Sequence, residues 1–566
     1  MRSPHPALVF AVVFVAIFLL HAPLLQLPYF WDEAGYYVPA ARDIFLTGSL
    51  IPHSTVSNAH PPLVMAWLAL WWRCVGFAPL VTRAAMLVIA AFSLLGLFRL
   101  AQRAANTEVA VAATLCTALY PVFFAQSSLA QVDLAAAGLT FWGLDAYLED
   151  RPLMVALWFS LAALAKETAI LAPIALAGWQ GLQWLTLRGT AALQGRDSRL
   201  GSNRALAPVV ESASARQTVA LFFPLVPLAL WYAYHYSRTG YVFGNPEYFR
   251  YNVGATLHPV RFLLALALRL WQAFGYLHLW VLTAAMLLTM RLTPVRDRVG
   301  PGLRLGQAEQ SSAASERPRI PIPVQMIFLV VVAAYIVAMA LIGGAELARY
   351  MLPAVPLVII VAVSTLRRRL RSWPAAIALI AAAFVAGWFW NPPYGFSPED
   401  NLAYRDFIVM HQDGVRFLEA RYPMAHALTA WPASEELTEP WLGYTTRPVQ
   451  VVRIEDFSLE EVLSAADFRS HFDVAFVFST KYEPPHPILE RFLGVLGRRN
   501  VNHWEDLKRR YFGYHRDLPP AAAGQILGGQ IVFAEQRKGQ WVAVIEMEKE
   551  EVLNAKQGWY QPRLQF

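Results

Sequence analysis

The chain has 566 residues, of which 56% are hydrophobic and only 15% are charged. Repeated apolar runs of about 20 residues match the thickness of a bilayer core. The composition therefore excludes an ordinary soluble protein and predicts a polytopic α-helical membrane protein. The net charge of +7 does not indicate nucleic-acid binding, because the arginines gather in loops between apolar runs. Cys74 and Cys116 lie in apolar surroundings, without the spacing of a disulfide framework or a zinc site.

The apolar runs before residue 391 are candidate membrane spans, about 11 to 13 in all. The first run is too long, and lacks the small-residue cleavage site, for a removed signal peptide. The candidate spans are residues 7–27, 62–76, 80–100, 109–125, 134–148, 153–165, 169–187, 219–236, 271–290, 324–341, 351–365 and 375–390.

Arginine-rich loops predict the orientation of these spans. Residues 188–217 and 293–323 are rich in Ser, Gly, Ala and Arg and predict flexible loops. Their arginines, with those of 367–371, place all three loops in the cytoplasm by the positive-inside rule. Twelve crossings would leave both termini on one side, whereas the charges place them on opposite sides. Either one crossing is missed or one span does not cross, and the short 62–76 stretch, which begins with two prolines, is the suspect.

The composition changes after residue 390 to that of a soluble domain. Strands are predicted at 449–454 and 472–479, and Ser458 with Glu461 has the capping-box spacing that starts a helix. Residues 530–534 and 541–546 alternate around Lys538-Gly539, a hairpin signal. We therefore predict a transmembrane domain over 1–390, including an outer-face loop at 28–60, and a periplasmic α/β domain over 391–566.

The stretch between the first two apolar runs carries an acidic pair, Asp32 and Glu33, directly outside a membrane helix. An amphipathic helix suited to the headgroup plane is predicted after the pair, ending at Gly48. Asp32 has a structural alternative, since Asp is a favoured N-cap residue. The apolar positions at helical spacing are Tyr37, Val38, Ala41, Ile44 and Phe45.

Other candidate residues also have structural alternatives. His60-Pro61-Pro62 is a usual way to begin a helix, and Arg349 could pair with Glu346 at a three-residue spacing. Ionisable groups at membrane depth are functional hypotheses by default, although residues at helix ends can reach the surface or pair. The residues of this kind at the ends of apolar runs are Asp133, Lys166 and Glu167.

The order of these pieces resembles the family 39 glycosyltransferases of the integral-membrane GT-C class, which include protein O-mannosyltransferases and the bacterial lipid A aminoarabinose transferase. The resemblance covers roughly the first 360 residues and is best over the first 170. His60 before the Pro-Pro step is closer to the O-mannosyltransferases. The matching pieces are Trp31-Asp32-Glu33 with Tyr36-Tyr37, His60-Pro61-Pro62-Leu63, 126–133, Lys166-Glu167-Thr168 and 348–353.

The resemblance implies transfer of a sugar, with inversion, from a polyprenyl-phosphate donor to a glycan, lipid or protein acceptor at the periplasmic face of the bacterial inner membrane. Asp32 is the candidate general base, and Arg349 and Lys166 are candidates for binding the phosphate. No cofactor is expected. Binding of a divalent ion by Asp32 and His60 remains an alternative, but we favour a site without metal. The remaining candidate substrate-binding residues are Glu33, Tyr36, His60, Asp133, His258 and Tyr350.

Two other classes remain open: a transporter or flippase for a lipid-linked glycan, and a membrane-anchored assembly protein without activity. The sequence has no evident internal repeat and no matching pair of broken helices, which are typical of transporters. A large outer domain also suits acceptor handling better than alternating access. Transfer of label from a polyprenyl-phosphate sugar by the purified protein would distinguish the three classes.

Overall fold

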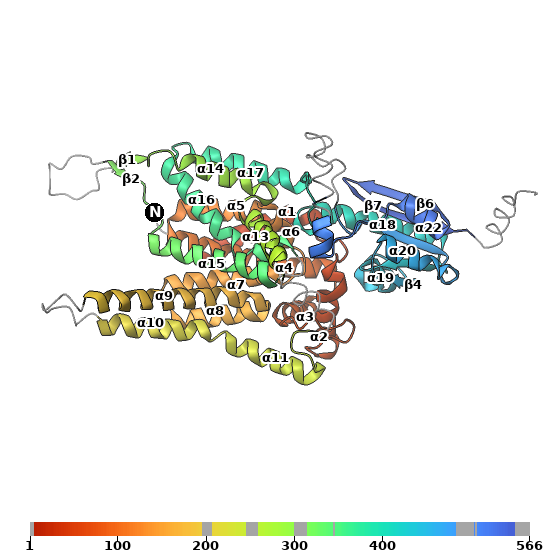
Figure 1. The fold of residues 1–566 in the computed structure, drawn as a ribbon, viewed down its shortest axis with the longest axis horizontal. Helices are drawn as coiled ribbons and strands as arrows, with labels where there is room; N and C mark the ends of the chain where they lie inside the picture. The colour runs from red at the N-terminus through yellow and green to blue at the C-terminus, as the bar shows by residue number, and fades with distance from the viewer. Residues whose placement is uncertain are drawn as a thin grey trace, which may run out of the picture. The chain divides into compact units, whose positions relative to one another are not determined.

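The computed structural model describes residues 5–194, 207–244, 258–298, 314–342, 346–482, 503 and 506–548. The chain forms two compact units (Figure 1). The helical unit consists of Met1–Leu25 and Ala40–Trp390, and the C-terminal unit consists of Gln26–Pro39 and Asn391–Phe566. The division differs from our sequence boundary in Gln26–Pro39, the segment that carries Asp32, which belongs to the C-terminal unit.

The helical unit is a bundle of apolar helices. Among the described residues, five helical segments are long and apolar enough to cross a membrane, as expected for a polytopic membrane protein: Pro6–Leu24, Pro79–Ala104, Ala215–Thr239, Pro259–Thr289 and Ile322–Ile342. The helices are α1 (Pro6–His21), α2 (Val38–Thr47), α3 (Leu63–Val75), α4 (Pro79–Ala104), α5 (Thr107–Leu119), α6 (Pro121–Gln126), α7 (Asp133–Leu148), α8 (Pro152–Ala165), α9 (Leu171–Gln194), α10 (Ala207–Phe222), α11 (Leu225–Thr239), α13 (Pro259–Phe274), α14 (Leu279–Thr289), α15 (Ile322–Ile342), α16 (Val355–Arg369) and α17 (Trp373–Phe389).

Three predicted spans are not single helices. Prolines at 121 and 224 separate α5 from α6 and α10 from α11, because proline lacks the N–H that an uninterrupted helix needs. The predicted span 271–290 is interrupted at Leu277 and His278, whose φ angles of 42° and 69° are left-handed. Helix α13, which precedes this break, was missed because its buried face carries arginines.

The two loops predicted to be flexible contain regular structure where they are described. Helix α9 continues to Gln194 and α10 begins at Ala207, so the ends of 188–217 are helical. In 293–323, β1 (Arg296–Arg298) pairs antiparallel with β2 (Ala314–Glu316). The remainder of both loops lies outside the described residues.

Helix α3, the suspect span, begins and ends at the same end of the helical unit. At its end, Trp72 donates from Nε1 to Thr82 Oγ1 at the start of α4, 3.0 Å away. Before its start, His60 contacts Glu167, which follows α8. The starts of α4 and α7 are joined by Arg83, which donates to Ser128 O, and the contact of Lys166 with Asp133 closes the ring. At about 20 Å for 13 residues, α3 is also shorter than a bilayer core.

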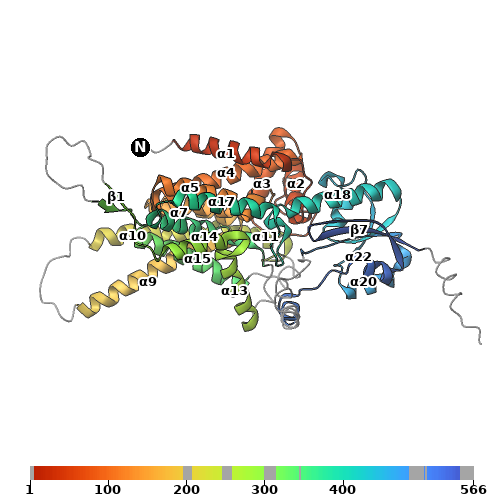
Figure 2. The ribbon, with the colours of Figure 1, turned by 90° about the horizontal axis from the view of Figure 1, so that it is seen from above.

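The helical unit therefore has two distinct ends. Helices α2 and α3 lie at one end, and β1 with the loop-side ends of α9 and α10 lies at the other (Figures 1 and 2). We call the first the site end, since it holds Asp133, Lys166 and Glu167. We call the second the arginine end, since it holds the described ends of the arginine-rich loops together with Arg99 and Arg103.

The C-terminal unit is an α/β domain built on a five-stranded sheet of order β4-β3-β5-β7-β6. Strands β4, β3 and β5 are parallel, while β7 and β6 form the predicted antiparallel hairpin. Lys538 and Gly539 supply the two positive φ angles, 46° and 90°, of its turn. The strands are β3 (His426–Ala430), β4 (Gln450–Ile454), β5 (Val474–Phe478), β6 (Gly529–Arg537) and β7 (Gln540–Met547).

Helices surround this sheet. Ser458 begins α20 as predicted, because its hydroxyl accepts a hydrogen bond from the Glu461 N–H at 3.3 Å. The two predicted strands correspond to β4 and β5. All residues of β5 are buried. Strand β3, which pairs with both, was not predicted. The helices are α18 (Ala403–Arg421), α19 (Ala433–Thr438), α20 (Leu459–Ala466) and α22 (Pro520–Leu527).

Candidate functional site

The acidic segment of the C-terminal unit has unusual backbone geometry. Trp31, directly before Asp32, has a φ of 49°, a left-handed conformation that costs energy in a non-glycine residue. Glu33–Tyr37 then forms one turn of π-helix, a form found mainly at functional sites. The predicted helix follows as α2 and ends at Gly48, whose φ is 78°.

The two neighbouring carboxylates differ in exposure. Glu33 is fully buried, and its Oε2 accepts a hydrogen bond from the Phe30 N–H at 2.9 Å. Asp32 is half-buried and occupies the N-cap position, yet its side chain makes no capping hydrogen bond. Asp32 therefore has the N-cap position of the structural alternative but not its side-chain capping bond. Glu33 instead ties the segment to its own backbone, which leaves Asp32 as the more accessible acid.

Aromatic packing within the C-terminal unit holds the acidic segment in place. The Trp31 ring meets the Trp431 ring edge-on, with centroids 5.0 Å apart. The Tyr29 carbonyl accepts a hydrogen bond from the Tyr444 hydroxyl at 3.0 Å. A Cβ atom on Gly35 would lie 2.5 Å from Trp431 Nε1, so the close approach of backbone and indole requires glycine there. These contacts offset the strain at Trp31.

A buried ionic cluster lies at the site end of the helical unit. Asp133, the first residue of α7, accepts a hydrogen bond at Oδ1 from Lys166 Nζ, 2.5 Å away. Its Oδ2 is 3.2 Å from Arg349 Nε. Arg349 also donates from Nη1 to Gln131 Oε1 at 2.7 Å. The three charged side chains are at most 5% exposed, so the cluster holds more positive than negative charge away from water.

Tyr350 lies in the middle of this positive charge. Lys166 Nζ is 3.8 Å from the centroid of its ring, and the guanidinium carbons of Arg349 and Arg269 are 5.7 and 5.8 Å from it. Arg269, on α13, is fully buried and donates from Nη1 to Gln272 Oε1 and to the Leu347 carbonyl. The quadrupole of the ring attracts all three cations. Their convergence gathers three cations in a water-poor environment, with Asp133 beside Lys166 and Arg349 and with Glu346 near Arg269.

A second polar pair lies beside the cluster in sequence. His60 Nδ1 is 3.0 Å from Glu167 Oε2, and His60 is 9% exposed. Helix α11 fixes the backbone before it: Trp231 donates from Nε1 to the Ala59 carbonyl at 2.9 Å, and His235 Nε2 contacts Ser57 Oγ at 2.8 Å. Ala59 has a left-handed φ of 58°, so these two contacts hold a strained turn that orients His60.

The structure brings only some of the predicted residues together. Asp133, Lys166, Arg349 and Tyr350 form one cluster, whereas Asp32, Glu33 and Tyr36 belong to the C-terminal unit. His258 caps α13, because its Nδ1 accepts from the Val260 N–H at 3.3 Å. Among the described residues, the ion pairs of Arg349 do not include the predicted one to Glu346. The same residues contain no group of three His, Cys, Asp or Glu side chains placed to hold a metal ion.

Sequence reasoning missed three contributors to the site end: Gln131, Arg269 and the hydrogen-bonding role of Glu167. Arg269 carried a usable signal, since it is an ionisable residue within the apolar run of α13. Gln131 lies within the matching piece 126–133, but a neutral amide in a loop does not by itself indicate a role.

The fold matches known membrane glycosyltransferases, although no protein-family model matches the sequence and no curated protein is similar to it. ArnT from Cupriavidus metallidurans bound to undecaprenyl phosphate superposes with a TM-score of 0.51 at 13% identity, over 95% of this chain and 97% of that one. Its apo structure gives a TM-score of 0.50 at 15% identity, over 95% and 98% of the two chains. The oligosaccharyltransferase of Archaeoglobus fulgidus gives 0.45 at 10% identity, over 95% and 73%. The chain has the GT-C fold.

Proposed function

We propose that this protein is a membrane glycosyltransferase that uses a polyprenyl-phosphate sugar as donor. The observation that carries the proposal is the buried convergence of Lys166, Arg349 and Arg269 on Tyr350 at the site end. Buried cations are costly unless an anion offsets them, and a single carboxylate, that of Asp133, contacts both Lys166 and Arg349. The donor phosphate is such an anion, and the structure of ArnT with undecaprenyl phosphate, which has the same fold, supports this choice.

In this proposal Arg349 and Lys166 bind the donor phosphate. Arg349 offers a planar guanidinium that matches two phosphate oxygens, and Lys166 offers a compact charge. Asp133 contacts both cations and fixes their positions. The two groups act most strongly as the phosphate departs, since its negative charge grows at that stage.

Asp32 acts as the general base. The acceptor hydroxyl oxygen attacks the anomeric carbon, the bond from that carbon to the phosphate oxygen breaks, and the lipid phosphate leaves with the electron pair. The hydroxyl proton passes to the Asp32 carboxylate, and the configuration at the anomeric carbon inverts. A half-buried carboxylate without a capping bond is suited to this role, which typically contributes about 10²–10⁴-fold in rate.

Charge distribution supports a periplasmic site in the bacterial inner membrane. The described ends of the arginine-rich loops lie at the end of the helical unit opposite Lys166, and the positive-inside rule places such loops in the cytoplasm. A single cysteine introduced into 188–217 or 293–323 should resist an impermeant thiol reagent in intact cells. One introduced into the C-terminal unit should react. Labelling of the arginine-rich loops from outside would overturn the orientation.

The decisive experiment is transfer of radiolabelled sugar from a polyprenyl-phosphate donor by the purified protein in detergent. We expect label in an acceptor with wild-type protein and about 10²–10⁴-fold slower labelling with Asp32→Asn. A flippase would instead move the labelled lipid across vesicle bilayers without forming product. Translocation without transfer would therefore replace the transferase proposal with the transporter.

A further inference from the structure

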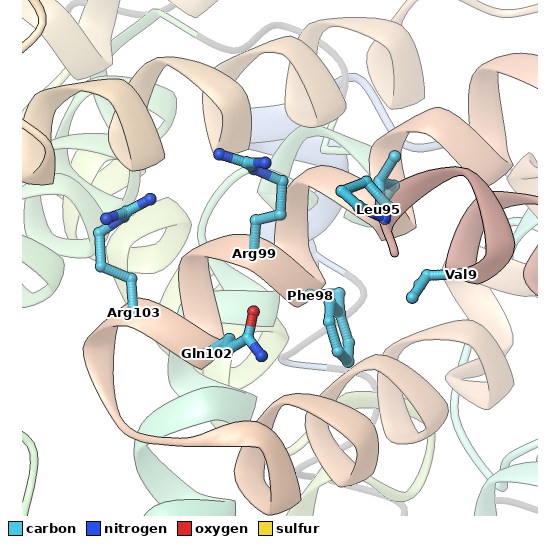
Figure 3. Close-up of a pocket in the computed structure, with 7 residues that line it drawn as sticks. Val9, Leu95, Phe98, Arg99, Gln102 and Arg103 are labelled. Atoms are coloured by element: carbon cyan, nitrogen blue, oxygen red, sulfur yellow. The ribbon is translucent and has the colours of Figure 1, made fainter. Parts of the chain in front are cut away.

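A cavity of about 300 Å³ lies at the arginine end of the helical unit, between the start of α1 and the last turns of α4. Figure 3 shows Val9 reaching it from one helix, while Leu95, Phe98, Arg99, Gln102 and Arg103 reach it from the other. Arg103 and Val9 stand at opposite sides of the view, so one part of the wall is charged and the other apolar. This volume is at the lower end of the range of about 300–1,000 Å³ for ligand sites.

Neighbouring acids hold the two arginines in place without covering them. Asp145 accepts from Arg99 Nε at 3.0 Å and from Arg103 Nε at 2.7 Å, and Glu149 contacts both guanidinium groups. The arginine side chains remain 29% and 32% exposed. Among the described residues, no hydrogen bond uses the Nη1 atom of either arginine. Each guanidinium therefore keeps donors for another anion.

The balance of charge around the cavity favours an anion. The two charged residues that line it, Arg99 and Arg103, are both cations, whereas their partner acids Asp145 and Glu149 are not part of its lining. Helix α1 begins at Pro6, which lines the cavity, so the positive end of its dipole adds to the field. The apolar part of the wall continues onto the exposed face of α1, where Leu8 and Val12 are each 60% exposed.

We propose that this cavity binds an anionic glycerophospholipid. The lipid phosphate accepts hydrogen bonds from Arg99 and Arg103, and an acyl chain follows Val9, Leu95 and Phe98 into the bilayer. A ligand charged at one end and apolar at the other matches this wall, and juxtamembrane arginines attract anionic lipid by about 1 kcal/mol each. The site lies at the opposite end of the helical unit from Lys166 and does not depend on the proposed function.

The test compares lipids that differ only in charge. The full chain in neutral detergent is titrated with phosphatidylglycerol or with phosphatidylcholine of identical acyl chains, and binding is followed by native mass spectrometry and by melting temperature. We expect about tenfold or greater preference for phosphatidylglycerol, from two arginine contacts. Equal binding of the two lipids would overturn the proposal. Glycerol 3-phosphate is the third probe, and the same stabilisation by it would show a site for free anions instead.

A variant that fills the cavity keeps the test independent of the ion pairs. Val9→Phe adds bulk inside the cavity and leaves the partners of Asp145 unchanged, whereas Val12→Phe adds the same bulk on the exposed face of α1. We expect Val9→Phe to abolish the preference for phosphatidylglycerol and Val12→Phe to retain it. Retention in Val9→Phe, or loss in both variants, would overturn the assignment to this cavity.

Discussion

Helix α7 carries the same ionic motif at both of its ends. At its start, Asp133 contacts Lys166 and Arg349, and in its last turns Asp145 contacts Arg99 and Arg103. Both carboxylates are 3% exposed, and each contacts two cations. By residue type and contact geometry alone, the two motifs would be assigned the same role.

Their surroundings differ. Around Asp145 the arginines are about one-third exposed and share a second acid, Glu149, so each charge has a partner or solvent. Around Asp133 the cations are at most 5% exposed, and Arg269 approaches the same tyrosine. Burial therefore distinguishes the two motifs: the cations that contact Asp133 are shielded from water, whereas the arginines that contact Asp145 reach it.

The largest expected effect concerns Asp32, the proposed general base, which belongs to the C-terminal unit. Asp32→Asn keeps the shape of the side chain but removes the proton acceptor, so we expect turnover to fall about 10²–10⁴-fold while donor binding is retained. Turnover and donor affinity are measured in matched detergent, with melting temperature as the folding control. Glu33→Gln is the matched neighbour; its carboxylate bonds to Phe30 N, so we expect a milder loss of turnover. A fully active Asp32→Asn protein would refute the base assignment.

The second prediction compares the two carboxylates of α7 directly. Asp133→Ala leaves two buried cations without their partner, which we expect to destabilise the protein by about 3–5 kcal/mol. Asp145→Ala leaves arginines that reach Glu149 and water, and we expect roughly 1 kcal/mol or less per lost pair. Thermal unfolding of both variants in one detergent measures the difference. Equal shifts in melting temperature would mean that burial does not make Asp133 contribute more to stability than Asp145.

Local patterns predicted much of the fold. Apolar runs predicted the membrane helices, and Ser458 predicted the start of α20. An apolar run predicted β5, and alternating residues around a turn predicted the β6–β7 hairpin. The predictions failed where long-range packing decides. Helix α13 was missed because its arginines are buried against η6 (Ala348–Met351) and α15. Strand β3 was missed because its partner strands, β4 and β5, come later in the sequence.

For the candidate site, too, local patterns predicted individual residues but not the contacts between distant parts of the chain. Ionisable residues in apolar runs identified Asp133, Lys166 and Arg349, although not that Asp133 contacts both cations. The sequence did not indicate that the Asp32 segment packs with the C-terminal unit. Trp31 and Trp431 are far apart in the chain, and no local spacing connects them.

The third prediction asks whether charge alone suffices at the site end. Arg349→Lys keeps the charge but loses the planar fork, so we expect donor affinity to fall roughly tenfold or more, since a hydrogen bond to a charged group contributes about 1.5–3 kcal/mol. Arg103→Lys is the matched control at the arginine end and should leave donor affinity unchanged. Equal donor affinity in Arg349→Lys and wild type would exclude a phosphate-binding role for the guanidinium. Aggregation of Arg349→Lys would indicate a structural role through Asp133.

The smallest expected effect concerns a carboxylate whose partners are neutral. Glu419, in the C-terminal unit, accepts at Oε1 from Thr445 Oγ1 at 2.5 Å and from the Thr446 N–H at 2.6 Å. Partial burial opposes its ionisation, but these hydrogen bonds outweigh burial and lower the pKa of Glu419. Because the folded-state pKa is lowered, the resulting stabilisation is present above the unfolded value of about 4.3 and is lost as the pH falls through the folded value.

Glu419→Gln should therefore lower the melting temperature slightly at pH 7, and this difference should shrink as the pH falls from the unfolded value of about 4.3 through the lowered folded value of the wild-type carboxyl. Asp467→Asn, at an exposed position of the same unit, is the matched acid-to-amide control and should show little effect at either pH. Thermal unfolding of the three proteins across this pH range makes the comparison. A Glu419→Gln difference that stays constant with pH would show that shape, and not charge, sets the contribution of this residue. Neutral donors would then stabilise a carboxylate no better than an amide here, in contrast to the cations that contact Asp133 and Asp145.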